Sequence, residues 1–329
     1  MKKHVSFVLA LLMCLACLLP LLAGCGSGKE RIVIWTSAED FRIEDMQKRF
    51  GEQFPDYEIV VDYKSTGDIA ARLLAEGPDT ECDIVYSLEY GYLSTLAAKQ
   101  YLASLKDYDM SAFEDDVVTS EYYVVDVRSG GAVILNPAVL EEKGLAEPTC
   151  YADLLKPEYK GYISMPSPKS SGTGYMFLKN LVNAWGEEQA FAYFDQLTPN
   201  ILSYTTSGSG PVNALCQKEV AVGLGMTAQA VQKINEGENL KIVYFEEGSP
   251  YSLYGNAMMK GKEQRACVKQ LFDFIVGTYI KETNEKFFPE HIIKGYTPAV
   301  KNYPTDIRYG DMSNDTPEEK TRLLGKWKY

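Results

Sequence analysis

A run of small hydroxyl residues and glycines between Pro166 and Tyr175 is the stretch of the chain best suited to bind a ligand. It follows the apolar run 161–165 and precedes apolar residues at helical spacing, which predicts a strand, a polar turn and a helix start. Free N–H groups at a helix start attract anions, glycines allow close approach to the backbone, and hydroxyls add donors. The run therefore predicts an anion-binding turn, although its serines and threonine could instead only cap the helix.

Polar residues also follow three predicted strands near the start of the chain. The apolar runs 31–35, 58–63 and 83–86 are each followed by hydroxyl or carboxylate residues and then by a helical pattern. Three successive strand–helix units predict a largely parallel sheet with helices on its faces. Ligands bind at the carboxyl ends of the strands in such sheets, which is where these polar residues are expected.

The pattern changes after residue 120. The ranges 122–128 and 132–136 are extended runs with no helix between them, as expected for a crossover into a second lobe. Strand and helix patterns then alternate again, with a second polar loop at 205–210, and residues 256–259 should return to the first lobe. We therefore predict an α/β protein whose first lobe is residues 31–130 plus 256–329 and whose second lobe is residues 131–255.

The N-terminus has the features of an export signal. Lys2 and Lys3 precede an apolar run that ends in small residues before Cys25, which predicts a signal peptide over residues 1–24 rather than a membrane span. This ending resembles a bacterial lipobox, so we expect Cys25 to carry a lipid and residues 25–30 to form a tether. Ordinary cleavage without a lipid is the alternative. The mature protein would lie outside the cytoplasm, anchored to the cell membrane at a cell surface or in a periplasm.

Composition excludes several classes of function. Removing the signal peptide leaves 31 basic and 45 acidic side chains, a formal charge of −14, which argues against binding to nucleic acid or to an anionic membrane surface. His291 is then the only histidine, so a histidine-based metal site or a Ser-His-Asp triad is not expected. The remaining cysteines match no zinc pattern, and their disulfide pairing stays open, the four being Cys82, Cys150, Cys216 and Cys267.

The order of these segments resembles the solute-binding proteins of bacterial ABC importers, in the branch that includes ferric-iron, phosphonate, phosphoglycerate and hexose-phosphate binders. The resemblance extends over nearly the whole mature chain. It rests on the serine-rich turn and on the ranges 34–37, 66–73, 151–161, 219–224, 247–248 and 295–300. It implies the two-lobed type II periplasmic-binding-protein fold, in which each lobe is a mixed, mostly parallel sheet flanked by helices and the lobes close over a ligand.

The resemblance also implies which residues surround the ligand. From the first lobe it selects Thr36, Ser37, Glu39, Ser65, Thr66 and Ser87. From the second lobe it selects Ser170, Ser171, Gly172, Thr173, Gly174, Ser207, Gly208, Ser209 and Thr227. For the hydroxyl residues, capping of the local turn is the competing interpretation.

The identity of the ligand is predicted from the same residues. Iron binders of this branch are expected to carry adjacent tyrosines after the strand that ends at Met226, where this chain has Thr227 and Ala228. Helix starts rich in Ser, Gly and Thr suit phosphate or phosphonate better, because charge-assisted hydrogen bonds to oxyanions are the stronger kind. We expect a small anionic organic ligand: a hexose phosphate, a phosphoglycerate or aminoethylphosphonate. Glu39 and Glu89, if they face the cleft, would accept hydrogen bonds from its hydroxyl or ammonium groups. Ferric iron is the alternative.

The expected partner is the permease of an ABC importer, served by a monomer without a cofactor, a bound metal or a catalytic activity. The sequence contains no nucleophile elbow and no recognisable catalytic constellation. An exported enzyme acting on phosphorylated compounds, which ligand turnover would reveal, is the alternative from another class. A sensor that passes closure to a membrane receptor is a third, because the same closed surface would serve both partners.

Overall fold

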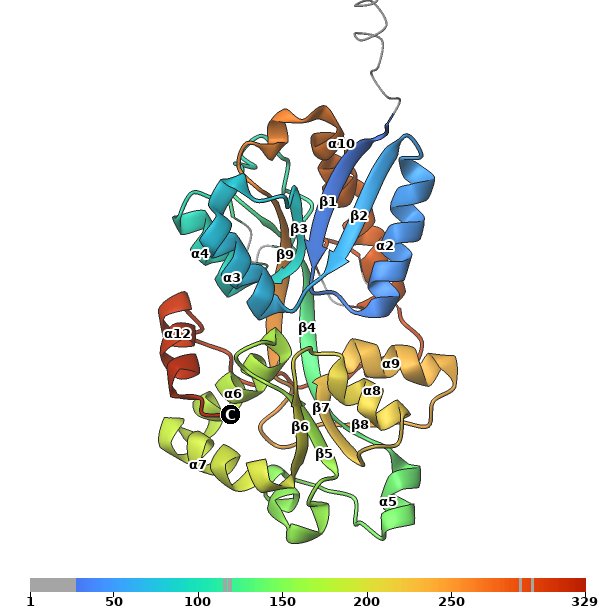
Figure 1. Ribbon diagram of the computed structural model, residues 1–329. Helices are drawn as coiled ribbons and strands as arrows, with labels where there is room; N and C mark the ends of the chain where they lie inside the picture. Colours follow the sequence, from blue (N-terminus) through green and yellow to red (C-terminus); the bar gives the residue numbers. More distant parts are fainter. Residues whose placement is uncertain (1–27, 115–116, 118–119, 290–291, 297–298) are drawn as a thin grey trace, which may run out of the picture.

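Two lobes joined by a pair of long strands make up the computed structural model, which describes residues 28–114, 117, 120–289, 292–296 and 299–329 (Figure 1). The connecting strands are β4 (Val124–Leu135) and β9 (Tyr251–Met258). The predicted signal peptide and Cys25 lie outside the described residues. Within the described ranges, no helix is both long enough and apolar enough to span a bilayer.

The first lobe is built on parallel strands with apolar centres. β1 (Glu30–Thr36) lies between β2 (Tyr57–Tyr63) and β3 (Ile84–Glu89) and pairs in parallel with both. β9 is antiparallel to β3 and to β4. The helical segments of this lobe are α2 (Asp40–Gln53), α3 (Thr66–Glu76), η2 (Gly77–Asp79), α4 (Tyr90–Ala98), η6 (Lys262–Gln264), α10 (Ala266–Phe274), the π-helical turn η7 (Ile275–Tyr279) and α11 (Ile280–Phe287).

The second lobe repeats this plan with shorter strands. β7 (Val222–Met226) is antiparallel to β4 and parallel to β5 (Ile163–Pro166), which pairs in parallel with β6 (Ile201–Thr205). β8 (Lys241–Val243) pairs with β4. The helical segments are α5 (Pro137–Lys143), η3 (Tyr151–Leu155), η4 (Pro157–Tyr159), α6 (Gly172–Trp185), α7 (Glu187–Leu197), η5 (Thr198–Asn200), α8 (Gly210–Cys216) and α9 (Thr227–Glu236).

The strand order β2-β1-β3-β9-β4-β7-β5-β6 makes one sheet that runs through both lobes. β4 pairs with β9 as far as Gly130 and with β7 from Gly131 onward, so one strand belongs to both halves of the sheet. The predicted lobe boundary between residues 130 and 131 falls at this change of partner. The predicted fold class, a two-lobed α/β protein with mixed sheets flanked by helices, is confirmed, although antiparallel pairs with β4 and β9 are as many as the parallel ones.

Each lobe has its own hydrophobic core. The first is centred on β1, β3, α2 and α10, with fully buried Trp35 and Phe50, and the second on β5, α6 and α7, with fully buried Phe177 and Phe194. Full burial of one such side chain contributes about 1.5–3 kcal/mol, so both lobes can hold their shape while they move relative to each other.

The C-terminal segment departs from the predicted division of the chain. The prediction assigns all of residues 256–329 to the first lobe, whereas Met312, Leu323 and Trp327 are buried in the core of the second. Leu323 lies within α12 (Pro317–Lys326), and Trp327 is the residue that directly follows this helix. The indole of Trp327 packs edge-on against the rings of Phe194 and Tyr204, with centroids 5.1 and 5.6 Å away. These buried apolar side chains draw the end of the chain onto the second lobe.

Candidate functional site

A polar cleft lies between the lobes and encloses about 450 Å³, counting the space at its open mouth. The structure brings most of the predicted ligand-binding residues together along its walls. From the first lobe these are Ser37, Glu39, Ser65, Thr66 and Ser87, and from the second Ser170, Ser171, Thr173, Ser207, Gly208 and Ser209. Residues more than a hundred positions apart in the chain thus share one small space.

Four predicted residues do not line the cleft. The hydroxyl of Thr36 accepts a hydrogen bond from the N–H of Ala38 at 3.0 Å, and that of Thr227 is 3.2 Å from the phenol of Tyr244. Both threonines are fully buried. Gly172 and Gly174 leave no room for a side chain, since a Cβ would lie 2.5 Å from the Tyr254 hydroxyl and 2.4 Å from the Pro166 carbonyl oxygen, respectively. These residues shape the turns behind the cleft wall.

The serine-rich turn performs two tasks. Ser171 is the N-cap of α6, and its hydroxyl accepts a hydrogen bond from the N–H of Gly174 at 3.4 Å. The hydroxyl of Ser170 is buried without a hydrogen-bond partner among the described residues, and Ser170 lines the cleft. The first N–H groups of α6 precede its first internal hydrogen bond. Capping therefore accounts for Ser171, while Ser170 and Thr173 face the space between the lobes.

The lobes touch at the mouth of the cleft. The N–H of Gly67, in the first turn of α3, donates a hydrogen bond of 3.1 Å to the carbonyl oxygen of Ser170 in the other lobe. A Cβ on Gly67 would lie 2.9 Å from the carbonyl oxygen of Lys169. The structure is therefore a closed form in which the two backbones meet directly.

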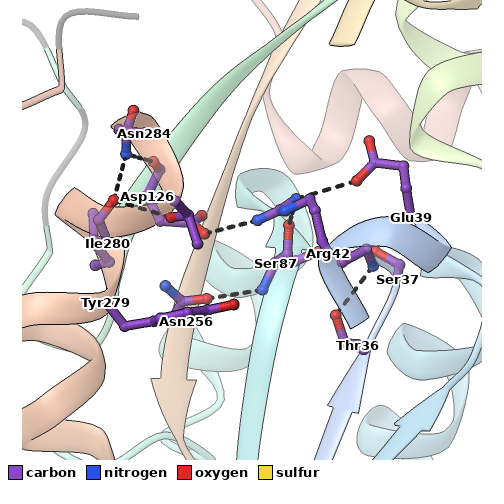
Figure 2. A network of polar contacts seen from close by, with 12 residues as sticks. Thr36, Ser37, Glu39, Arg42, Ser87, Asp126, Asn256, Tyr279, Ile280 and Asn284 are labelled. Atoms are coloured by element: carbon purple, nitrogen blue, oxygen red, sulfur yellow. Dashed lines mark hydrogen bonds and ion pairs between the residues drawn. The ribbon is translucent and has the colours of Figure 1, made fainter. Parts of the chain in front are cut away.

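Sequence analysis missed the cation at the base of the cleft. Arg42 is only 2% exposed, and its guanidinium donates to the Ser87 hydroxyl at 3.0 Å and to the Asp126 carboxylate at 3.2 Å (Figure 2). A weaker contact of 3.4 Å joins it to Glu39. The other lining residues that were not predicted are Ala38, Tyr63, Ser129, Met226 and Tyr254. One signal was available, because Arg42 shares the buried face of α2 with Met46 and Phe50 at a spacing of four residues.

Burial and pairing set the charges in this network. Burial lowers the pKa of Arg42, but Tyr86, Glu39 and Asp126 together outweigh it, and the guanidinium stays protonated. Burial also raises the pKa of Asp126 to about 6, although Arg42 pulls it the other way. One oxygen of Glu39, Oε1, is buried without a partner within the described part of the chain.

Ser87, which also lines the cleft, has a strained backbone conformation. Its φ of +55° lies in the left-handed region, at an irregularity of β3 between Val85 and Leu88. The N–H of Ser87 donates to the side chain of Asn256 at 2.8 Å, and its carbonyl oxygen accepts from the Ser37 hydroxyl at 2.8 Å (Figure 2). Such strain persists where surrounding contacts hold it, typically beside functional sites.

Glu89 does not face the cleft. The ligand contact that was predicted for it required that it face the cleft, so this prediction does not apply. Its carboxylate is fully buried and forms an ion pair with Lys320 of α12. It also accepts from the N–H of Gly91 at 3.1 Å and from the Ser252 hydroxyl at 3.3 Å. A carboxylate with these partners has no lone oxygen left for a ligand.

The adjacent tyrosines Tyr122 and Tyr123 do not line the cleft. Tyr123 is buried in the core of the first lobe and hydrogen-bonds Ser94 at 2.9 Å. No cluster of three or more histidine, cysteine, aspartate or glutamate residues suited to a metal occurs among the residues that the structure describes. The four cysteines in these ranges are all free thiols.

Comparison with solved structures gives close matches over the whole fold. The periplasmic binding protein AfuA from Actinobacillus pleuropneumoniae, solved with exogenous fructose 6-phosphate bound, is 25% identical, with a TM-score of 0.78 over 91% of this chain and 98% of that one. Iron-bound HitA from Pseudomonas aeruginosa is 18% identical, with a TM-score of 0.70 over 90% of this chain and 98% of that one. At that identity the second match shows the fold alone.

Sequence comparison gives a consistent result. An uncharacterised protein of Haemophilus influenzae is 28% identical over 319 residues, which cover 93% of this chain and 92% of that protein. The family model described as bacterial extracellular solute-binding protein matches residues 79–329, which include all of the second-lobe cleft wall. The chain therefore belongs to the bacterial extracellular solute-binding proteins and has their two-lobed type II fold.

Proposed function

We propose that this protein binds a phosphorylated or phosphonate organic compound in the interlobe cleft and delivers it to the permease of an ABC importer. The observation that carries the proposal is a set of buried polar atoms on the cleft walls without partners in the described ranges: Glu39 Oε1, Ser129 Oγ and Ser170 Oγ. A buried polar atom left unpaired costs about 1–3 kcal/mol, so a polar ligand that pairs with these atoms is stabilised.

The second-lobe wall suits the oxyanion end of such a ligand. The N-terminus of the fourteen-residue helix α6 opens at Ser171, and the hydroxyls of Ser170 and Thr173 stand beside it. Ser207 and Ser209 add hydroxyls from the next turn. A helix N-terminus with converging N–H and O–H donors binds phosphate groups well. That AfuA was solved with fructose 6-phosphate bound supports the same class of ligand.

Closure of the lobes would couple binding to delivery. A ligand that touches both walls makes its full set of contacts only in the closed form, so it shifts the population toward that form. The permease can then recognise the closed surface. A lipid on Cys25 would keep the protein close to the membrane in which the permease lies.

A thermal-shift screen tests the proposed function. Glucose 6-phosphate, glycerol 3-phosphate and 2-aminoethylphosphonate are compared with glucose, glycerol, ethanolamine, inorganic phosphate and ferric citrate at matched concentrations. A ligand that binds only the folded form raises the melting temperature, so we expect a rise with at least one phosphoryl or phosphonyl compound and none with its partner lacking that group. A rise with ferric citrate alone would overturn the proposal.

Serine variants then locate the oxyanion. Ser170→Ala should weaken binding by about 1–3 kcal/mol and leave the unliganded stability unchanged, because the Ser170 hydroxyl has no partner in the described structure. Ser171→Ala should in addition lower the free energy of unfolding by about 1 kcal/mol, because it removes a helix cap. Ser203→Ala, on an exposed part of β6, is the matched control. Equal affinities of the Ser170→Ala variant and the unmodified protein in calorimetry would count against the assigned wall.

A further inference from the structure

The first-lobe wall of the cleft carries an excess of negative charge. Glu39 and Arg42 are the charged residues among those that line it, and Asp126 lies directly behind Arg42. Each of the three side chains is at most 4% exposed. The one guanidinium is shared between two carboxylates, so one negative charge in this group is not compensated.

Two cations near the cleft, Lys64 and Lys320, are engaged elsewhere. The ammonium of Lys64 pairs with Asp62 and lies 4.9 Å above the ring of Trp35. Lys320 pairs with Glu89 behind the second-lobe wall. Asp126 takes the shorter contact with Arg42, 3.2 Å against 3.4 Å for Glu39. Glu39 therefore holds the weaker share of the guanidinium.

Glu39 is also held so that one oxygen points away from the network. Glu39 is the N-cap residue of α2, but its carboxylate makes no capping hydrogen bond. Oε2 is the oxygen that contacts Arg42, while Oε1 is buried and unpartnered in the described ranges (Figure 2). A carboxylate that merely complemented the dipole of α2 would point at the helix N–H groups. This one presents a lone oxygen and a net charge to the cleft.

We propose that the ligand is a zwitterion, with an ammonium group bound by Glu39 in the first lobe and a phosphoryl or phosphonyl group bound by Ser170 and Thr173 in the second. This inference rests on the proposed function and narrows its ligand class. An ammonium both donates to Oε1 and compensates the excess charge, whereas a hydroxyl would donate and leave that charge buried. A second oxyanion at Glu39 would be repelled.

The two ends of such a ligand explain why both walls are needed. The ammonium would satisfy the first lobe and the oxyanion the second, so neither lobe alone completes the site. A ligand with both groups would carry a net charge no more negative than that of a monoanion. This suits a cleft whose lining residues offer no unpaired cation. Hexose phosphates, which carry hydroxyls in place of the ammonium, would bind more weakly for this reason.

The experiment uses three compounds that differ only at one end: 2-aminoethylphosphonate, 2-hydroxyethylphosphonate and ethylphosphonate. Their dissociation constants are measured by calorimetry on the purified protein, on Glu39→Gln, and on Glu44→Gln, a change at an exposed position of the same helix. We expect the amino compound to bind at least about tenfold more tightly than the hydroxy compound, since hydrogen bonds to charged groups are the stronger ones. Glu39→Gln should abolish that preference, and Glu44→Gln should keep it.

The outcomes separate this inference from the proposed function. If the hydroxy compound or glucose 6-phosphate binds as tightly as the amino compound, or if Glu39→Gln keeps the amino preference, the zwitterion is wrong and the phosphoryl-binding function stands. If no phosphoryl or phosphonyl compound binds at all, both fall. Melting temperatures of the two variants, measured without ligand, show whether a lost preference reflects a lost fold.

Discussion

Arg42 and Asp126 organise the base of the cleft as a pair. The guanidinium lies 4.9 Å from the ring centroid of Phe288 and 5.6 Å from that of Tyr86, which encloses it between aromatic rings. Asp126 is its closest carboxylate, and Asp126 Oδ1 has no partner in the described ranges. A buried pair of this kind contributes little net stability, but either partner alone is costly. The same guanidinium contacts the Ser87 hydroxyl and the Glu39 carboxylate.

The raised pKa of Asp126 predicts a pH-dependent stability. Burial moves this pKa from its ordinary 3.8 to about 6 in the folded protein, so folding favours the protonated form. The stability that Asp126 contributes is therefore fully present below pH 3.8 and is lost as the pH rises through 6. As the pH rises over this interval, the unmodified protein loses stability that Asp126→Asn keeps. The difference in unfolding free energy between the two should therefore shift by roughly 3 kcal/mol in favour of the variant, about 1.4 kcal/mol per pH unit. Denaturant unfolding at several pH values measures it, and a constant difference would contradict the expectation.

At the scale of the element, α12 joins the lobes behind the cleft. Arg322 and Lys326 pair with Glu187 of α7 in the second lobe, while Lys320 reaches Glu89 in the first. The Lys320 ammonium also lies 4.1 Å from the ring centroid of Tyr92 and 4.5 Å from that of Tyr175. Tyr175 is on α6, the helix that starts at the serine-rich turn. The last helix thus supports both walls from outside.

Removing only one partner of the buried ion pair between Glu89 and Lys320 should destabilise the fold more than removing both. Glu89→Gln removes the ion-pair partner of the buried Lys320 ammonium, with Asp315 left as the other nearby carboxylate, and should cost about 3–5 kcal/mol of unfolding free energy. Adding Lys320→Met to the same chain should recover part of that loss, because no charge remains unpaired. Lys326→Met, which removes an exposed pair on the same helix, should cost less than about 1 kcal/mol. Denaturant titrations compare them, and equal losses in Glu89→Gln and Lys326→Met would argue against the buried pair.

At the scale of the whole molecule, two rigid cores share strands β4 and β9 and meet again at the mouth of the cleft. The shared strands allow the lobes to turn relative to each other without breaking either core. The contact between Gly67 and Ser170 exists only when the lobes are together. Its geometry therefore reports directly on closure.

Gly67→Ala should weaken ligand binding by favouring the open form. An added Cβ would meet the backbone of Lys169 and Ser170 at 2.9 and 3.1 Å, and backbone atoms cannot move aside as a flexible side chain can. We expect an increase in the dissociation constant of about tenfold, equivalent to about 1.4 kcal/mol. Gly51→Ala, where an added Cβ meets nothing within 4 Å, is the matched control. Equal affinities of the two variants in calorimetry would show that closure does not bring these backbones together.

Local sequence patterns were sufficient to predict the architecture. Apolar runs at β1 and β3, helical spacing in α2 and hydroxyl residues at the strand ends are properties of short segments, and they predicted the α/β fold, which the structure confirms. They also predicted the polar turns that the structure brings together along the cleft. The signal peptide and the lipid on Cys25 stay predictions, as do the roles of the cleft residues.

Contacts between distant segments were decided by the tertiary structure alone. Glu89 and Lys320 are 231 positions apart, and no pattern near either one indicates that they neutralise each other. Arg42 and Asp126 are 84 positions apart, and the burial of the arginine was visible only as a charged residue on an apolar helix face. Strands, helices and polar turns could thus be predicted from the sequence, because they depend on local spacing. Which charges are paired, and which one lines the cleft, depends on packing across the whole chain.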